Sequence, residues 1–198
     1  MTHLVQDQIE VYAKQVSKGK NPYCGDSFYF TSTDDYFICI LADGLGSGKF
    51  AYESSNAVVE LVEKYHHEDV STLMDYCNQE LMHKRGAAVA IMKVYYASNE
   101  FEYSCVGNIR FYLYSSVGKM TYPLPVTGYL SGRPQKYRTQ RFSYEPQSKF
   151  LLHSDGLNIT NIKSLLQNSN SLRKINDEIS LRLAEPIDDT TFIVGSLL

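Results

Sequence analysis

The chain has 198 residues and a net charge of −3, with 43% hydrophobic and 21% charged residues. This length predicts a single domain over residues 1–198, since ~150 residues already bury ~70% of their unfolded surface. The slightly acidic balance predicts no nucleic-acid partner and no membrane partner. Its N-terminal residues lack a signal-peptide pattern, and four cysteines occur without a C-x-x-C pair, so we expect a cytoplasmic protein with reduced thiols.

Strand-like and helical stretches follow each other along the chain. β-branched and aromatic residues run together or alternate in residues 5–16, 27–32, 36–42, 87–96, 102–106, 110–115, 119–123, 149–154 and 191–196, which we predict to be strands. Apolar residues at helical spacing predict helices at residues 47–65, 70–82 and 162–183, the last split near 168–170 and ended by Pro186.

The order of these elements favours an α+β fold. Regular strand-helix-strand alternation is absent, so we expect a four-layer α-β-β-α sandwich of two antiparallel sheets flanked by helices. The run Phe37-Ile38-Cys39-Ile40-Leu41 is apolar on both faces of its strand. Such a strand fits a sandwich in which one face meets the other sheet and the opposite face meets a helix layer.

Four acidic sites share one pattern, each at the end of an apolar strand and beside a glycine or another carboxylate. They are Cys24-Gly25-Asp26-Ser27, Leu41-Ala42-Asp43-Gly44, His153-Ser154-Asp155-Gly156 and Ile187-Asp188-Asp189-Thr190-Thr191. A single Asp-Gly pair is a common turn. Here two Asp-Gly pairs occur together with an Asp-Asp pair at the start of a strand, which favours instead a shared cleft centred on Asp43. Carboxylates that meet in one cleft repel each other unless cations lie between them. Oxygen ligands select hard ions such as Mg²⁺ or Mn²⁺.

Six motifs extend this pattern over nearly the whole chain. They are Gly25-Asp26-Ser27, Ala42-Asp43-Gly44-Leu45-Gly46, Arg85-Gly86-Ala87-Ala88, Val106-Gly107-Asn108-Ile109-Arg110, Ser154-Asp155-Gly156-Leu157 and Asp188-Asp189-Thr190-Thr191. In this order they resemble the metal-dependent serine/threonine phosphatases of the PPM (type 2C) family, and most closely its SpoIIE-like bacterial branch. The resemblance implies an α-β-β-α phosphatase that hydrolyses phosphoserine or phosphothreonine in regulatory proteins of a stressosome-type complex. It also implies feedback on a general-stress sigma factor and a monomeric state.

The same resemblance implies a role for each acidic residue. Two Mn²⁺ or Mg²⁺ ions would activate the attacking water and neutralise phosphate charge. Asp43 would bridge both ions, and with Asp26 it would be catalytic. The implied metal ligands are Asp26, Asp43, the Gly44 carbonyl, Asp155, Asp188 and, as an auxiliary ligand, Asp189.

Several residues depart from the family pattern. Leu45 stands where many eukaryotic relatives carry a histidine proposed as general acid, so the acid here must be a metal-bound water or another residue. Gly25 and Asn108 stand where relatives carry carboxylates, which predicts a weakened metal position and a millimolar metal requirement. The N-terminal segment offers no phosphate-binding arginine, because the first arginine of the chain is Arg85.

Residues 128–141 combine basic and aromatic side chains. They fit either a solvated hairpin or an arm that binds the protein substrate through Arg133 and Arg138, since arginine suits phosphate and acidic groups. Two other functions stay open: a catalytically weak docking module of the same fold that regulates a signalling partner, and a small-molecule phosphoesterase. Clustered carboxylates argue against the first, and the shallow site expected of a short chain argues against the second.

Overall fold

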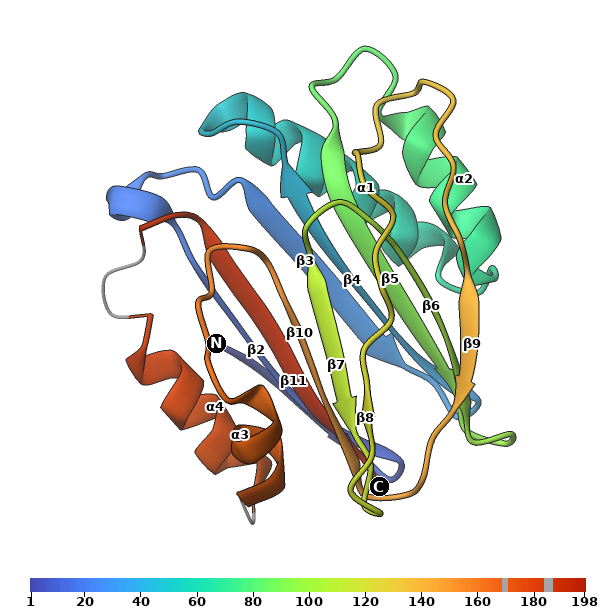
Figure 1. Ribbon diagram of the computed structural model, residues 1–198. Helices are drawn as coiled ribbons and strands as arrows, with labels where there is room; N and C mark the ends of the chain where they lie inside the picture. Colours follow the sequence, from blue (N-terminus) through green and yellow to red (C-terminus); the bar gives the residue numbers. More distant parts are fainter. Residues whose placement is uncertain (169–170, 184–186) are drawn as a thin grey trace.

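The computed structural model describes residues 1–168, 171–183 and 187–198. Two antiparallel sheets face each other, and helices cover the outer face of each sheet (Figure 1). The predicted four-layer α-β-β-α sandwich is therefore confirmed.

The strands of the two sheets come from different parts of the chain. The first has the order β1-β2-β11-β10-β7-β8, formed by Thr2–Gln6, Ile9–Val16, Thr190–Leu197, Ser148–His153, Arg110–Tyr114 and Met120–Thr121. The second has the order β3-β4-β5-β6-β9, formed by Asp26–Ser32, Tyr36–Gly44, Ala87–Tyr95, Glu100–Val106 and Gln140–Ser143. In the first sheet, strands from both ends of the described sequence are neighbours, since β11 lies between β2 and β10.

The helices form the outer layers. Helices α1 (Lys49–Tyr65) and α2 (Val70–Glu80) cover the second sheet, whereas α3 (Ile162–Asn168) and α4 (Leu172–Leu181) cover the first (Figure 1). α2 begins at Asp69, whose side chain accepts a hydrogen bond from the Thr72 amide and thereby caps the helix. None of the helices in the described ranges has the length and hydropathy of a membrane span.

Apolar residues form three layers, one between each two neighbouring layers of the four-layer sandwich. The layer between the sheets includes Phe37, Leu41, Phe111 and Phe150, and the layer beneath α1 and α2 includes Ile38 and Ile40. Alternate residues of β4 thus enter different apolar layers, as predicted for a strand that is buried on both faces. The third layer lies between the first sheet and α3 and α4.

Parts of the predicted secondary structure differ from the structure. Residues 5–16 form a hairpin of β1 and β2, with Gln6 paired to Ile9, instead of one strand. The strand expected at 119–123 is reduced to β8. Residues 128–139 contact α2 through Asn78 and are followed by β9, which pairs with β6, so this segment does not form a hairpin of its own; its alternative role in substrate binding stays a prediction. The expected break at 168–170 lies partly, and Pro186 entirely, outside the described residues.

Candidate metal centre

Asp26 and Asp43 lie opposite each other on neighbouring strands. Asp26 begins β3, and the register of the sheet pairs it with Asp43 near the end of β4. Both follow the alternation that places Phe28 and Leu41 against the layer between the sheets. Their carboxylates therefore share one face at one end of the second sheet.

The Asp26 carboxylate is almost completely buried, with 1% of the residue exposed. Its Oδ2 accepts a hydrogen bond of 2.7 Å from Ser154 Oγ, at the end of β10 in the other sheet. Ser154 Oγ also accepts a hydrogen bond of 2.9 Å from the Thr191 amide of β11. Asp26 Oδ1 has no hydrogen-bond partner among the described residues. A buried carboxylate oxygen without a donor is a candidate for coordinating a cation.

Asp155 and Asp188 lie just beyond the ends of two strands of the first sheet. Asp155 follows β10, and its Oδ2 accepts a hydrogen bond of 2.7 Å from Asn108 Nδ2. Asp188 precedes β11, and its Oδ1 lies 3.7 Å from the Lys18 ammonium group. Both residues are exposed. They lie at the end of the sandwich where Asp26 is buried and Asp43 is half-buried.

Asp189 holds the segment that leads to Asp26. Its Oδ1 accepts a hydrogen bond from the Lys18 amide, and its Oδ2 accepts one from the Gly25 amide, both at 2.8 Å. A Cβ atom on Gly25 would lie 2.9 Å from Asp189 Oδ2. Any larger side chain at position 25 would therefore displace the Asp189 carboxylate. Asp189 fixes the backbone before Asp26, whereas its role as an auxiliary ligand stays a prediction.

Burial and repulsion between carboxylates raise the pKa values of Asp26, Asp43 and Asp155. The pKa of Asp43 rises to about 8, first through burial and then through the charges of Asp26, Asp155, Asp188 and Asp189. Burial also raises the pKa of Asp26 to about 7, against the lowering effect of the Ser154 hydroxyl. Although Asp155 as a whole residue is exposed, partial burial of its carboxyl group and then the charge of Asp188 raise its pKa. The predicted convergence of the four strand ends is thus confirmed.

The donor chemistry at this end of the sandwich fits a hard divalent cation. Every candidate donor is an oxygen, and cations would relieve the repulsion that raises the pKa values. No group of three or more Asp, Glu, His or Cys side chains in the described ranges is arranged to hold an ion as it stands. Asn108 and Lys18 occupy oxygens of Asp155 and Asp188. These two carboxylates would have to turn from those partners to join Asp26 and Asp43 at an ion.

Gly44 connects the Asp43 strand to α1 through a very close backbone approach. A Cβ atom on Gly44 would lie 1.9 Å from the Ala51 carbonyl oxygen of α1, so only glycine fits. The Gly44 amide donates to the Gly25 carbonyl at 3.0 Å, and the Leu45 amide donates to the Gly86 carbonyl at 3.0 Å. The turn next to Asp43 is therefore fixed from both sides. Whether the Gly44 carbonyl binds a cation stays a prediction.

Arg133 and Arg138, on the arm formed by residues 128–139, have different surroundings. Both residues are exposed. Arg133 lines a hollow beside residues 82–85, and Arg138 does not. Asn78 of α2 holds the arm, because its Oδ1 accepts hydrogen bonds of 3.1 Å from the amides of Ser131 and Gly132.

Ser154 and Asn108 contribute to the site in ways that the sequence patterns did not predict. Ser154 joins the two sheets through Asp26, and Asn108 donates its amide to Asp155. Strand alternation could have identified Ser154, because it continues the inward-facing positions Phe150 and Leu152 of β10. The sequence marks Asn108 as a position without a carboxylate, but it does not indicate the hydrogen bond to Asp155.

Comparison with known proteins agrees with this geometry. The family model described as Stage II sporulation protein E (SpoIIE) matches residues 33–194. The chain belongs to the SpoIIE family. This SpoIIE-family protein is 44% identical over 191 residues to the phosphoserine phosphatase RsbX of Bacillus subtilis (strain 168), covering 96% of each chain. The predicted membership of the SpoIIE-like branch is confirmed.

Solved structures share the fold of this SpoIIE-family protein. A crystal structure of RsbX in complex with magnesium superposes with a TM-score of 0.96 at 43% identity, covering 100% of this chain and 99% of RsbX. A structure from work on the bacterial stressosome has a TM-score of 0.84 at 22% identity, covering 96% and 100% of the two chains. The phosphatase PstP in complex with two manganese ions has a TM-score of 0.75 at 18% identity, covering 96% and 99%. At these lower identities the likeness shows the fold.

Proposed function

We propose that this protein is a metal-dependent phosphoserine protein phosphatase. The observation that carries the proposal is the meeting of Asp26 and Asp43 with Asp155 and Asp188 at adjacent ends of the two sheets, where the pKa values of Asp26, Asp43 and Asp155 are raised. Buried like charges destabilise a fold unless a ligand offsets their repulsion. The 44% identity to a phosphoserine phosphatase supports the same chemistry.

Two Mg²⁺ or Mn²⁺ ions, when bound, supply water activation and neutralise the charge of the phosphoryl group. Asp43 and Asp26 would hold them from the second sheet, and Asp155 and Asp188 from the first. Ser154 and Asp189 orient this set, since one holds Asp26 Oδ2 and the other holds the Gly25 amide. Leu45 has no group that transfers a proton, so the leaving serine oxygen does not receive its proton from position 45.

We further propose that residues 1–198 form one phosphatase domain, because both sheets contribute to the same apolar layer. Its proposed substrates are phosphorylated regulatory proteins of a stressosome-type complex. The relationship to RsbX and the fold shared with a stressosome-related structure support this partner class. A monomeric state and a cytoplasmic location stay predictions, which sedimentation velocity and cell fractionation would test.

The direct test measures phosphate release from a phosphoserine protein at increasing Mn²⁺ or Mg²⁺, comparing wild type with Asp43→Asn. We expect metal-dependent release by the wild type and at least a hundredfold loss in the variant, of the order seen for key electrostatic groups. Equal rates would exclude the catalytic role of Asp43. Absence of activity in both proteins would favour a docking module, and saturation by trace metal would contradict a weakened metal position.

A further inference from the structure

The segment between α2 and β5 runs beside the turn that follows Asp43. We call residues 82–85 the rim segment. His83 adopts a left-handed backbone conformation with φ of 68°, which turns the chain after α2. The next strand then begins beside Gly86, whose carbonyl accepts the Leu45 amide at 3.0 Å. The backbone of the rim segment therefore leads directly to the turn that follows Asp43.

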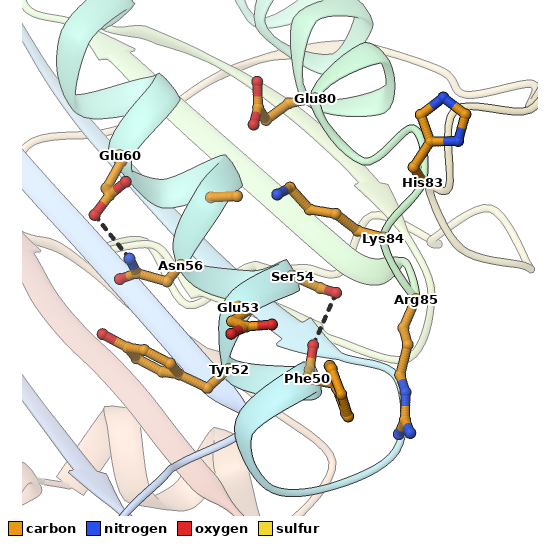
Figure 2. Close-up of a pocket in the computed structure, with 11 residues that line it drawn as sticks. Phe50, Tyr52, Glu53, Ser54, Asn56, Glu60, Glu80, His83, Lys84 and Arg85 are labelled. Atoms are coloured by element: carbon orange, nitrogen blue, oxygen red, sulfur yellow. Dashed lines mark hydrogen bonds between the residues drawn. The ribbon is translucent and has the colours of Figure 1, made fainter.

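Arg85 is the rim residue nearest to that turn. Its guanidinium stacks on the Phe50 ring at 5.0 Å, and its Nη1 lies 2.7 Å from the position of a Cβ atom on Gly46. Figure 2 shows Arg85 extending toward the turn before α1, while His83 points away from α1. Among the described residues, Arg85 has neither an ion pair nor a hydrogen bond. A stacked guanidinium keeps its N–H groups free for an anionic ligand.

Two hollows border the rim segment, and their charges differ. The hollow toward α1, shown in Figure 2, is also lined by Lys84 and Arg85, but the carboxylates of three glutamates outnumber these two cations and would repel an anion: Glu53, Glu60 and Glu80. The second hollow, which we call the arm hollow, lies between the rim segment and residues 129–133. Arg85 and Arg133 line the arm hollow, and its lining contains no carboxylate. Its volume of about 400 Å³ falls within the ~300–1,000 Å³ of typical ligand sites.

The walls of the arm hollow are held by specific contacts. Leu130 and Ala87 exchange backbone hydrogen bonds of 2.9 and 3.0 Å, so the arm pairs directly with the start of β5. A Cβ atom on Gly132 would lie 2.7 Å from the Met82 Cα, which shows how closely the arm contacts the rim segment. With Asn78 holding the next amides of the arm, the hollow is formed without a ligand.

We propose that the arm hollow binds acidic side chains next to the phosphoserine of the protein substrate, with Arg85 and Arg133 as specificity-determining residues. The inference rests on the proposed phosphatase function and adds a substrate class to it. The carboxylates of the metal centre repel an acidic substrate segment. The positive charges of Arg85 and Arg133 beside the centre offset this repulsion, so they select for such a segment and orient it. Arg85 contributes to both the arm hollow and the surroundings of the Asp43 turn, so an acidic flank held there brings the phosphoserine to the carboxylate end of the cleft.

Peptide binding tests the inference without catalysis. Fluorescence anisotropy in EDTA compares a labelled phosphoserine peptide flanked by glutamates with the same peptide flanked by glutamines. We expect the wild type to bind the glutamate peptide roughly tenfold more tightly. Arg85→Glu and Arg133→Glu should abolish this preference, and Arg85→Lys should keep part of it. Lys136→Glu, an exposed charge reversal on the same arm outside the hollow, is the matched control and should keep the preference.

Equal binding of the two peptides by the wild type would overturn the inference, and so would an equal loss in Lys136→Glu and Arg133→Glu. Kinetics on the same peptides with Mn²⁺ separate this result from the proposed function. If the wild type releases phosphate from both peptides at the same kcat/KM, the phosphatase function stands and the arm hollow is not a specificity site. If no metal-dependent release occurs, the proposed function fails, and the anisotropy result alone decides whether the hollow binds acidic segments. Thermal unfolding of each variant verifies that the fold is retained.

Discussion

Asp26→Asn should stabilise the metal-free protein at alkaline pH, although it removes a candidate ligand. Burial raises the pKa of Asp26 from 3.8 to about 7. Between these two pH values, Asp26 keeps its proton in the folded protein but has lost it in the unfolded chain. The contribution of Asp26 to the free energy of unfolding is therefore fully present below pH 4 and is lost as the pH rises to 7. At 1.36 kcal/mol per pH unit, the loss is about 4 kcal/mol. An asparagine keeps an acceptor for Ser154 but leaves its buried amide unpaired, at about 1–3 kcal/mol, so the net gain above pH 7 is about 2 kcal/mol.

Urea unfolding in EDTA at several pH values between 5 and 8 measures this difference. The free energy of unfolding of the wild type should decrease as the pH rises, while that of Asp26→Asn should change less, so the two curves separate at high pH. Asp34→Asn, at an exposed carboxylate, is the control and should follow the wild type. Adding Mg²⁺ at pH 8 should stabilise the wild type more than Asp26→Asn. A constant difference between wild type and Asp26→Asn at every pH would refute the reasoning.

Three further substitutions test other parts of the structure. Asp189→Ala removes the acceptor of two backbone amides near Asp26. The Mn²⁺ concentration for half-maximal activity should therefore rise roughly tenfold, which corresponds to about 1.4 kcal/mol. An unchanged metal titration would contradict the role of Asp189 in fixing the backbone before Asp26. Lys93→Met removes a buried ammonium group that donates hydrogen bonds to three carbonyls just after α1. The free energy of unfolding, measured in urea, should fall by about 3 kcal/mol, while kcat/KM should stay within twofold of the wild type. Gly44→Ala introduces a Cβ atom into the α1 backbone and should destabilise the fold by about 3 kcal/mol or more; a melting temperature equal to that of the wild type would show that the turn can relax.

The location of the candidate site could be predicted from the sequence, but the contacts that shape it could not. Asp26, Asp43, Asp155 and Asp188 each follow or precede an apolar strand, so their convergence follows from the sandwich architecture. The hydrogen bonds of Asp189 to Lys18 and Gly25 join residues 171 and 164 positions apart, and no local pattern encodes such pairings.

Weak local signals explain the errors in secondary structure. The hairpin of β1 and β2 turns at Asp7-Gln8, which lacks the glycine that usually marks a two-residue turn. β9 is a four-residue edge strand in which only Phe142 is strongly apolar, so its pairing with β6 was not evident. Both elements depend on tertiary neighbours more than on local propensity.

The central position of β11 has a consequence for biosynthesis. This strand is the last element of the described sequence, yet it lies between β2 and β10 and begins next to Asp188 and Asp189. While the ribosome is still adding residues before 188, β2 and β10 lack the strand that joins them, and the Gly25 amide lacks its acceptor. A nascent chain without β11 therefore lacks both the closed first sheet and the contact that holds the segment before Asp26. Pairing over this sequence separation also predicts slow folding.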